Sequence, residues 1–497
     1  MKKITLVVFL LSQGLGSFAQ SFVLDTTFQP FFDITKQRGA LISDMYESKS
    51  GKLYITGEFT LQLPPQLNSF NGIISIFTDG RRNFSFNNIG GGGIIMPISD
   101  SVFVNGNNAY GLIDTNGNRF NYNWLLNYNK SIKCKTGTPY FYSDGSSLFG
   151  NGRDNSGMPC PTIYNGDTLT RRHILKLTPD GLWDSTFTGD ANHPPVGFAP
   201  YDSNRILIYG VPTRFSHYNG VRINGLCRIF LDGTLDTTFT SPMSTSFNFN
   251  YFIPKLVEKD GGFFLSGTFL LEDYPNQYLT LVRLKADGSL DSRFMNFSGP
   301  TDSTNFVYGV SALATTEDGG YLVGGVFNSY QGHAKNGIAK IDSNGKVQPQ
   351  YFINSGPDSS DWQGVGYPSV NFIYKSKFGG YYVGGDFRKW NGKSVQPIVR
   401  ITDLVTSVRE NPSLAEKATI AVFPNPSNGY FTISSDEKVM AFSVIDLLGE
   451  EVISQPSVIT NSNESLAVIL SNHKDGIYFL RLTLEDGSLI SKKLIKN

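Results

Sequence analysis

The chain has 497 residues, and its 42 Lys plus Arg balance its 42 Asp plus Glu, so the formal net charge is zero. This balance argues against a nucleic-acid or anionic-membrane binder, because such proteins need a positive field. Only 17% of the residues are charged, 13% are aromatic and 52 are Gly, which suits neither a helical bundle nor a disordered chain. The composition indicates an all-β protein with many tight turns.

The N-terminus has the pattern of an export signal. A basic start at residues 1–3 precedes an apolar run at 4–11, which is too short to span a bilayer. Ser17 and Ala19 then place small residues at the two positions that a signal peptidase reads. We therefore predict a signal peptide over residues 1–19 and no transmembrane segment in the mature chain.

The chain has three cysteines, Cys134, Cys160 and Cys227. An odd, low count is not a disulfide framework. Cys134 and Cys160 lie in the least regular part of the chain and are a candidate pair on an oxidising export route. Cys227 lies in a strand-like run, and we expect it to pack as a small apolar residue.

A repeat organises most of the sequence. One motif consists of Asp-Gly, a second Asp and a closing aromatic residue, and it recurs at 180–187, 232–239 and 287–294. Less complete copies occur at 79–86 and 344–351. An apolar strand flanked by glycines shares this period and occurs seven times, at 51–59, 101–106, 144–150, 203–210, 261–269, 319–327 and 379–387. Because this strand lacks polar alternation, we predict that both of its faces are covered.

Each repeat is expected to contain four strands. A short alternating strand precedes each Asp-Gly turn, as at 174–177 and 281–284, and Asp-Gly between two such runs favours a primed hairpin turn. Seven repeats between residues 20 and 403 give about 55 residues each, which matches the blade of a propeller. β-Solenoid coils are shorter, and a sandwich domain needs about 100 residues. The sequence therefore predicts an all-β, seven-bladed β-propeller.

The two ends of this region complement each other. The last repeat ends at residues 398–401 without the strand that normally follows, and residues 22–28 have the pattern of that missing strand. We predict that the N-terminal strand pairs with residues 399–401 and closes the ring, which removes open sheet edges.

The repeat resembles the delta-sixty repeat, a bacterial propeller family of uncharacterised function. The resemblance covers residues 22–403. It is carried by the glycine-rich strand, the strand that bears Lys or Arg, and the Asp-Gly-x-Leu-Asp-x-x-Phe motif. It implies no catalytic residues.

After residue 403 the composition changes. Residues 404–419 are predicted to be a linker, and residues 420–497 contain several alternating strands that predict a small Ig-like β-sandwich. Landmarks follow in a fixed order: Pro424, Asn425, Pro426, Gly429, Gly449, Gly476, Tyr478, Lys492 and Lys493. This order is similar to that of the C-terminal sorting domain of the Por, or type IX, secretion system. The resemblance implies handling by type IX machinery and a final place in the medium or on the outer-membrane cell surface.

The sequence gives no catalytic, cofactor-binding or metal site. The five His residues lack metal-ligand spacing, and no nucleophile-elbow motif is present. An aromatic–Asn/Gln–Gly loop recurs at Phe70, Tyr218, Tyr330 and Trp390. Tyr218, Tyr330 and Trp390 are candidate ligand-binding residues whose rings would stack on sugar faces. The alternative is a structural turn with its ring packed on the blade.

One strand position is basic in five of the repeats. It holds Lys176, Arg228, Arg283, Lys340 and Arg400, and Asp184, Asp236 and Asp291 lie across the turn. We expect structural ion pairs here, and a polar ligand site only if these groups line a channel.

The leading functional interpretation is a secreted or cell-surface scaffold that binds a glycan or a protein without covalent chemistry. The alternatives are an extracellular carbohydrate-active enzyme that uses carboxylates at the channel mouth, and a structural protein of the surface matrix. The fold alone does not decide between them.

Overall fold

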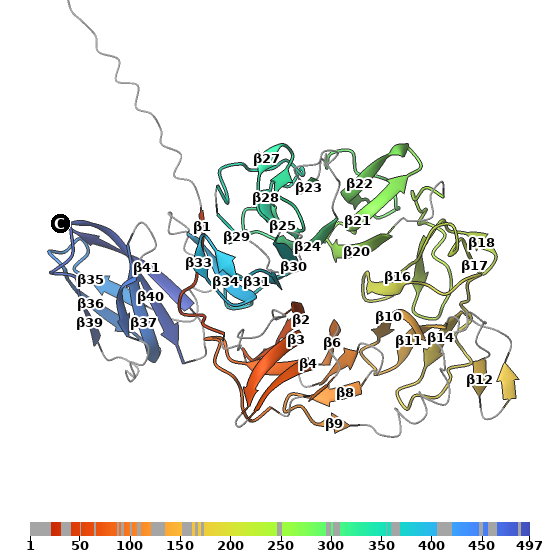
Figure 1. Ribbon diagram of the computed structural model, residues 1–497, viewed down its shortest axis with the longest axis horizontal. Coiled ribbons are helices and arrows are strands. Elements are labelled where there is room, and N and C mark those ends of the chain that lie inside the picture. Colours follow the sequence, from red (N-terminus) through yellow and green to blue (C-terminus); the bar gives the residue numbers. More distant parts are fainter. Residues whose placement is uncertain are drawn as a thin grey trace, which may run out of the picture. The chain divides into compact units, whose positions relative to one another are not determined.

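The structure of the protein is a computed structural model. It describes residues 21–30, 41–49, 51–63, 66–86, 89–90, 94–99, 102–106, 111–120, 135–151, 162–164, 167–169, 173–245, 251–294, 300–301, 309–353, 355–358, 368–404, 420–446, 451–455, 465–485 and 489–497. Every regular element in these ranges is a β-strand (Figure 1), as the composition predicts. The chain forms two compact units, one built mainly from Leu24–Thr402 and the other from Asp403–Glu485 with Ile490–Asn497. The predicted signal peptide, the linker at 405–419, Cys134, Cys160 and Gly449 lie outside the described residues.

The first unit repeats one antiparallel sheet. Its pattern is clear in β24 (Val310–Thr315), β25 (Tyr321–Gly325) and β28 (Ile338–Ile341), which are ordered β24-β25-β28. The middle strand, β25, is buried at every position, which confirms the prediction of a strand covered on both faces. The same arrangement recurs in β2 (Leu41–Glu47), β3 (Leu53–Leu63) and β4 (Gln66–Ile76); β6 (Ile94–Ser99), β7 (Val102–Gly106) and β8 (Gly111–Asp114); β10 (Lys135–Phe141), β11 (Ser147–Asn151) and β14 (Ile174–Leu177); β15 (Gly197–Pro200), β16 (Arg205–Tyr209) and β19 (Leu226–Phe230); β20 (Tyr251–Val257), β21 (Phe263–Leu271) and β22 (Tyr274–Leu284); and β30 (Ser369–Lys375), β31 (Tyr381–Asp386) and β34 (Ile398–Leu404).

These sheets follow one another around a common axis, with their first strands innermost (Figure 1). The first strands contact each other in chain order: β2 contacts β6, β10 contacts β15, β15 contacts β20, β20 contacts β24, and β24 contacts β30. β30 in turn contacts β2, so the series returns to its start. This arrangement is a β-propeller. The count of seven blades stays a prediction, because segments such as 121–134 fall outside the described residues.

The Asp-Gly turns correct one expectation. The N–H of Gly233 donates to the carbonyl of Phe230, and the N–H of Phe230 donates to the carbonyl of Thr234. Gly233 has φ 94°, whereas Asp232 is not among the residues with positive φ. The turn is therefore a three-residue loop with Gly in the left-handed region, and the predicted primed turn is wrong. The Asp232 carboxylate favours this loop because it accepts hydrogen bonds from the N–H of Thr234 at 2.9 Å and from its hydroxyl at 2.8 Å.

The predicted closure of the ring is confirmed. The last sheet has the order β1-β34-β31-β30, with β1 (Ser21–Leu24) contributed by the N-terminal end. The N–H of Asp25 donates to the carbonyl of Arg400 at 2.8 Å, just as the N–H of Asp236 donates to the carbonyl of Arg228 at 2.9 Å. The N-terminal segment therefore occupies the place that the fourth strand holds in the other repeats.

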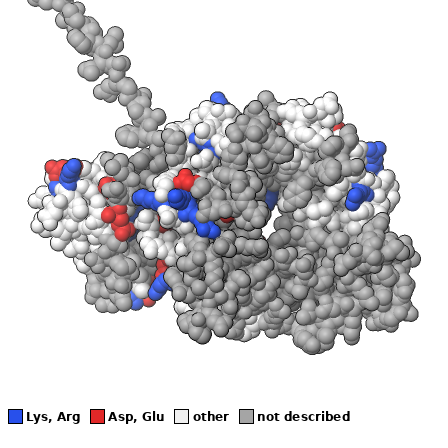
Figure 2. Space-filling view, viewed as in Figure 1, with Lys and Arg blue, Asp and Glu red and all other residues white. Residues whose placement is uncertain are grey.

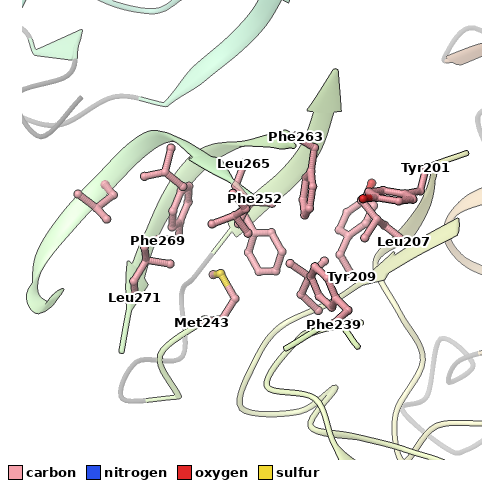
Figure 3. Close-up of a cluster of buried hydrophobic side chains, with 14 residues drawn as sticks. Tyr201, Leu207, Tyr209, Phe239, Met243, Phe252, Phe263, Leu265, Phe269 and Leu271 are labelled. Atoms are coloured by element: carbon pink, nitrogen blue, oxygen red, sulfur yellow. The ribbon is translucent and has the colours of Figure 1, made fainter. Parts of the chain in front are cut away.

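Apolar side chains fill the space between neighbouring sheets. One such cluster, drawn in Figure 3, joins the sheet of β15, β16 and β19 to the sheet of β20, β21 and β22. Tyr201 and Phe263 meet edge to face there, with ring centroids 6.1 Å apart. Cys227 is buried in the adjacent cluster as a free thiol, which confirms its predicted role as a small apolar residue.

Turns add a second connection between neighbouring repeats. The closing aromatic of one repeat packs beneath the Asp-Gly turn of the next, as Phe187 does with Gly233 and Phe239 with Gly288. A hydrogen bond of 2.9 Å from the N–H of Thr240 to the carbonyl of Asp287 accompanies the second contact. The repeated Gly therefore provides both the left-handed backbone and the room for a neighbouring chain.

The second unit is a small β-sandwich. One sheet has the order β35-β36-β39, with β35 (Ile420–Phe423), β36 (Tyr430–Ser435) and β39 (Ser465–Ile469). The other has the order β38-β37-β40-β41, with β37 (Val439–Ile445), β38 (Glu451–Gln455), β40 (Gly476–Leu484) and β41 (Leu489–Lys496). Their facing side chains form one apolar core that includes Phe431, Leu480 and Leu494.

Hydrogen bonds join the first landmark residues of the tail to its last strand. The Asn425 side chain donates to the carbonyl of Lys493 at 2.6 Å and accepts from the N–H of Ile495 at 2.8 Å. The segment that carries Pro424 and Pro426 lies between β35 and β36, consistent with prolines outside the middle of a sheet.

Candidate functional site

The candidate sugar-stacking rings are buried, so that expectation is wrong. Tyr218 and Tyr330 are 0% exposed and Trp390 is 1% exposed, which leaves no ring face for a ligand. The Tyr218 hydroxyl donates to the carbonyl of Gly233 at 2.7 Å. The Phe70 side chain lies outside the described residues.

Each of these rings anchors a two-residue hairpin. Asn219 and Gly220 have φ values of 45° and 80°, as a primed turn requires. The same turn occurs at Gln331 with Gly332, and at Asn391 with Gly392. The aromatic residue precedes the turn and packs inward, as Trp390 does against Phe387 with centroids 5.9 Å apart. The loops are therefore structural turns, which was the alternative interpretation.

The repeated basic residues form buried ion pairs. The Arg228 guanidinium lies 2.7 Å from the Asp236 carboxylate, and both side chains are 3% exposed. The equivalent pair that closes the ring, Arg400 with Asp25, is separated by 3.0 Å. In one repeat, Gln348 replaces the Asp, and Lys340 pairs with Asp318 instead. These pairs are structural, as expected, because each cation already has its carboxylate.

Arg228 also connects neighbouring repeats. It donates to the carbonyl of Ala286 at 2.5 Å and lies over the Tyr201 ring, 4.5 Å from the centroid. The hydrogen bonds of Thr238 and Arg228 hold the pKa of Asp236 well below its usual range against the opposing effect of burial. The carboxylate therefore stays ionised, and the pair fixes the geometry between the sheets.

Among the charged residues of the innermost strands, Asp44 and Lys255 lie outside this pattern and differ from the repeated pairs. Asp44 lies on β2 and Lys255 on β20, and both are partly exposed. The Asp44 carboxylate accepts hydrogen bonds from the N–H of Ile95 at 2.9 Å and from that of Met45 at 2.8 Å. Burial raises the pKa of Asp44 to about 6, and the charge of Lys255 opposes this rise. Burial lowers the pKa of Lys255, while Asp44 raises it.

Lys255 differs from the repeated cations in its partners. Within the described part of the chain, it makes no ion pair within 4.0 Å, and its electrostatic partner is Asp44. A partly desolvated ammonium without a hydrogen-bonded carboxylate is costly for a protein unless another anion compensates it. Lys255 therefore has the properties expected of a ligand-binding cation.

Bulges shape the innermost strands around these residues. β2, β24 and β30 each have a bulge at the same register, opposite Gly57, Gly325 and Gly385. The bulges insert polar residues, Ser43, Ser311 and Asn371. On β20 the bulge lies beside Lys255, at Leu256, whose φ is 39°. A bulky residue in the left-handed region is strained, and such strain often accompanies a functional site.

The described innermost strands carry one further carboxylate. Besides Asp44 they carry Glu47, which is buried and accepts hydrogen bonds from the Ser376 hydroxyl at 2.9 Å and the N–H of Lys377 at 2.8 Å. No cluster of His, Cys, Asp and Glu suited to a metal occurs among the described residues. On the face in Figure 2, described charges of both signs occur in small groups among uncharged residues.

Comparisons with known proteins agree with this architecture. Residues 421–497 match a family model described as "Secretion system C-terminal sorting domain". Residues 213–239 match one described as "Domain of unknown function (DUF5122) beta-propeller". Comparison with the curated proteins gives no match.

Several solved structures are similar over much of the chain. The extracellular domain of a one-component system from B. thetaiotaomicron is 9% identical, with 95% of this chain and 98% of that chain covered and a TM-score of 0.18. A luciferin-regenerating enzyme is 9% identical, with coverages of 78% and 96% and a TM-score of 0.29. Sucrose-6-phosphate hydrolase from Lactobacillus gasseri is 10% identical, with coverages of 95% and 89% and a TM-score of 0.23. These TM-scores are too low to carry an argument about function.

The fold and the family matches define a class of protein. It is an all-β propeller protein with a C-terminal sorting tail. The tail is that of the type IX secretion system, so the protein is exported to the cell surface or secreted. The described residues include no helix that is both long and apolar enough to cross a membrane.

Proposed function

We propose that this exported propeller is a binding scaffold, and that its innermost strands hold a ligand with a negatively charged group. The ligand is an acidic glycan or an acidic segment of a protein. The observation that carries the proposal is the contrast between Lys255 and the repeated cations. Arg228 and Arg400 are neutralised by carboxylates, whereas Lys255 has no ion-pair partner among the described residues.

Several features support a role in binding rather than catalysis. General acid–base cleavage of a glycoside needs two carboxyl groups about 5–10 Å apart. Both carboxylates of the described innermost strands, Asp44 and Glu47, already accept hydrogen bonds from the protein. A rigid propeller presents its inner strands as a preformed site. The charge of Lys255 supplies attraction, and the Ser43 and Ser311 hydroxyls at the bulges supply hydrogen bonds that set specificity.

Binding can be tested with the purified full chain on an array of acidic and neutral glycans, together with acidic peptides. We expect retention of acidic ligands, with affinity reduced about tenfold or more in Lys255→Gln, because a hydrogen bond to a charged group contributes about 1.5–3 kcal/mol. Lys259→Gln is the matched control, since Lys259 is an exposed lysine just after the same strand. Its affinity should stay within about twofold of the wild type.

Two results would contradict the proposal. If the wild type retains no acidic ligand while its thermal unfolding shows a folded protein, the scaffold does not bind this class. If Lys255→Gln binds as tightly as the wild type, the ligand lies elsewhere on the propeller.

A further inference from the structure

The smaller sheet of the sorting domain has an apolar outer face. Directly opposed residues on neighbouring strands share a face, and residues along a strand alternate between faces. Phe423 on β35 is opposite Thr432, and Tyr430 on β36 is opposite Ile469 on β39. Phe423, Tyr430 and Ile469 therefore lie on one face, and their exposed fractions are 50%, 56% and 53%.

This face also lacks charge. The register places eight residues on it: Ala421, Phe423, Tyr430, Thr432, Ser434, Ser465, Ala467 and Ile469. None of the eight is Asp, Glu, Lys or Arg. We call these eight residues the apolar face.

The other sheet of the same sandwich differs. On β40, Leu480 and Leu482 are fully buried, so Arg481 between them points to the outer side. On β41, Leu494 is fully buried, which places Lys493 on the outer side in the same way. A solvated sheet face normally carries such polar groups. The apolar face therefore lacks the charged side chains that the outer side of the other sheet carries. Contiguous exposed apolar residues commonly mark an interaction site.

We propose that the apolar face is the surface by which a protein component of the type IX secretion machinery docks on the folded tail. The family match identifies this unit as a sorting domain, so a protein must recognise it. Because the face carries no charge, its partner must present an uncharged apolar surface rather than a complementary charge. The inference does not depend on the proposed ligand of the propeller.

The apolar face exists only in the folded sorting domain. Its residues come from three segments, 421–423, 430–434 and 465–469, which meet only when the sheet has formed. Recognition therefore requires a folded sorting domain rather than a linear motif. Phe423 also directly precedes Pro424, so the face adjoins the segment in which the landmarks of the sorting domain begin.

Export by a host with a type IX system tests this inference on the full-length chain. The triple variant Phe423→Ser, Tyr430→Ser, Ile469→Ser should accumulate in the periplasm, and its surface plus medium fraction should fall about tenfold or more, as expected when central apolar anchors are lost. The control is Phe84→Ser with Ile353→Ser, which removes two large apolar residues of the propeller that are 83% and 62% exposed. Its export should match the wild type.

A second measurement does not depend on the stability of the triple variant. A photo-crosslinking phenylalanine analogue at position 430 should form an adduct with a type IX component, identified by mass spectrometry, whereas the analogue at position 481, on the outer side of the other sheet, should not. Wild-type export of a folded triple variant, or equal adducts from both positions, would overturn the proposal. Binding of the purified wild type, but not of the triple variant, to phosphatidylethanolamine vesicles would also overturn it, because the face would then contact lipid.

Discussion

At the scale of single residues, Asp44 shows how position changes the chemistry of one side chain. Asp236 is surrounded by donors that keep its pKa low, whereas desolvation dominates at Asp44 and raises its pKa to about 6. Near neutral pH the Asp44 carboxylate is therefore ionised, and its negative charge interacts with Lys255. In mildly acidic medium the carboxyl is neutral and no longer competes with an anionic ligand for Lys255. Acidic ligands should accordingly bind more tightly below pH 6.

The titration of Asp44 also gives a prediction about stability. The folded state holds a proton up to about pH 6, while the unfolded chain releases it near 3.8. More protons are then bound in the folded state between these values, so stability falls as pH rises from about 4 to about 6. We expect the free energy of unfolding of the wild type, relative to Asp44→Asn, to fall by on the order of 1–3 kcal/mol across this window. Urea unfolding at a series of pH values measures it, and a flat difference would show that Asp44 titrates normally.

At the scale of elements, the Asp-Gly turn acts as a connector between repeats as well as a hairpin loop. Gly288 has φ 88°, and a Cβ placed on it would lie 2.1 Å from the carbonyl oxygen of Thr240 in the preceding repeat. Gly332, in one of the short exposed hairpins, has φ 77°, and a Cβ placed there would have no neighbour within 4 Å. The two glycines share a backbone conformation and differ in how closely another segment approaches.

This pair allows the two effects to be separated. Gly332→Ala should lower the free energy of unfolding by about 1 kcal/mol, which is the cost of the left-handed conformation. Gly288→Ala should lower it by about 2–4 kcal/mol, because the contact with Thr240 must also shift. Chemical denaturation of both variants compares them directly. Equal losses would mean that the contact between repeats tolerates a methyl group.

The repeated elements could be predicted from sequence because their physical causes are local. A glycine-flanked apolar run indicates a strand covered on both faces, and Arg228 followed eight positions later by Asp236 indicates a pair across a hairpin. The turn type was missed because Asp232 bonds to its own loop, a local competition that the dipeptide alone does not reveal. The sequence left Tyr218 open between a ligand residue and a structural turn, because a primed turn exposes its own two residues while the ring that precedes it is buried.

The candidate site could not be predicted in the same way. Asp44 and Lys255 belong to different repeats and do not occupy the position that carries the repeated basic residues, so no period relates them. The available signal was a charged residue within an otherwise apolar first strand. Only the arrangement of the first strands around the axis brings the charges of the two residues close enough to interact.

At the scale of the whole molecule, contacts between distant parts of the sequence close the ring, and one of them is a buried ion pair. Asp25 and Arg400 are buried, with side chains 4% and 6% exposed, and their charged groups are 3.0 Å apart. Asp25→Ala should therefore lower the free energy of unfolding by about 3–5 kcal/mol, because it leaves a buried guanidinium without its carboxylate.

The matched control is Asp79→Ala. It removes the carboxylate of a pair with Arg81 whose side chains are 41% and 81% exposed, and the loss should be at most about 1 kcal/mol. Thermal and urea unfolding of the two variants measure the difference. A similar small loss for both would indicate that the closing sheet is held by its backbone hydrogen bonds and apolar contacts instead.

The sheet that closes the propeller has a consequence for biosynthesis. Its first strand is made among the earliest residues, yet the strand that receives it, β34, is made just before the sorting domain. A ribosome that stops upstream of residue 398 therefore releases a chain that has neither a closed ring nor the C-terminal sorting domain. The residues that close the ring and those that form the sorting domain are therefore translated last, one directly after the other.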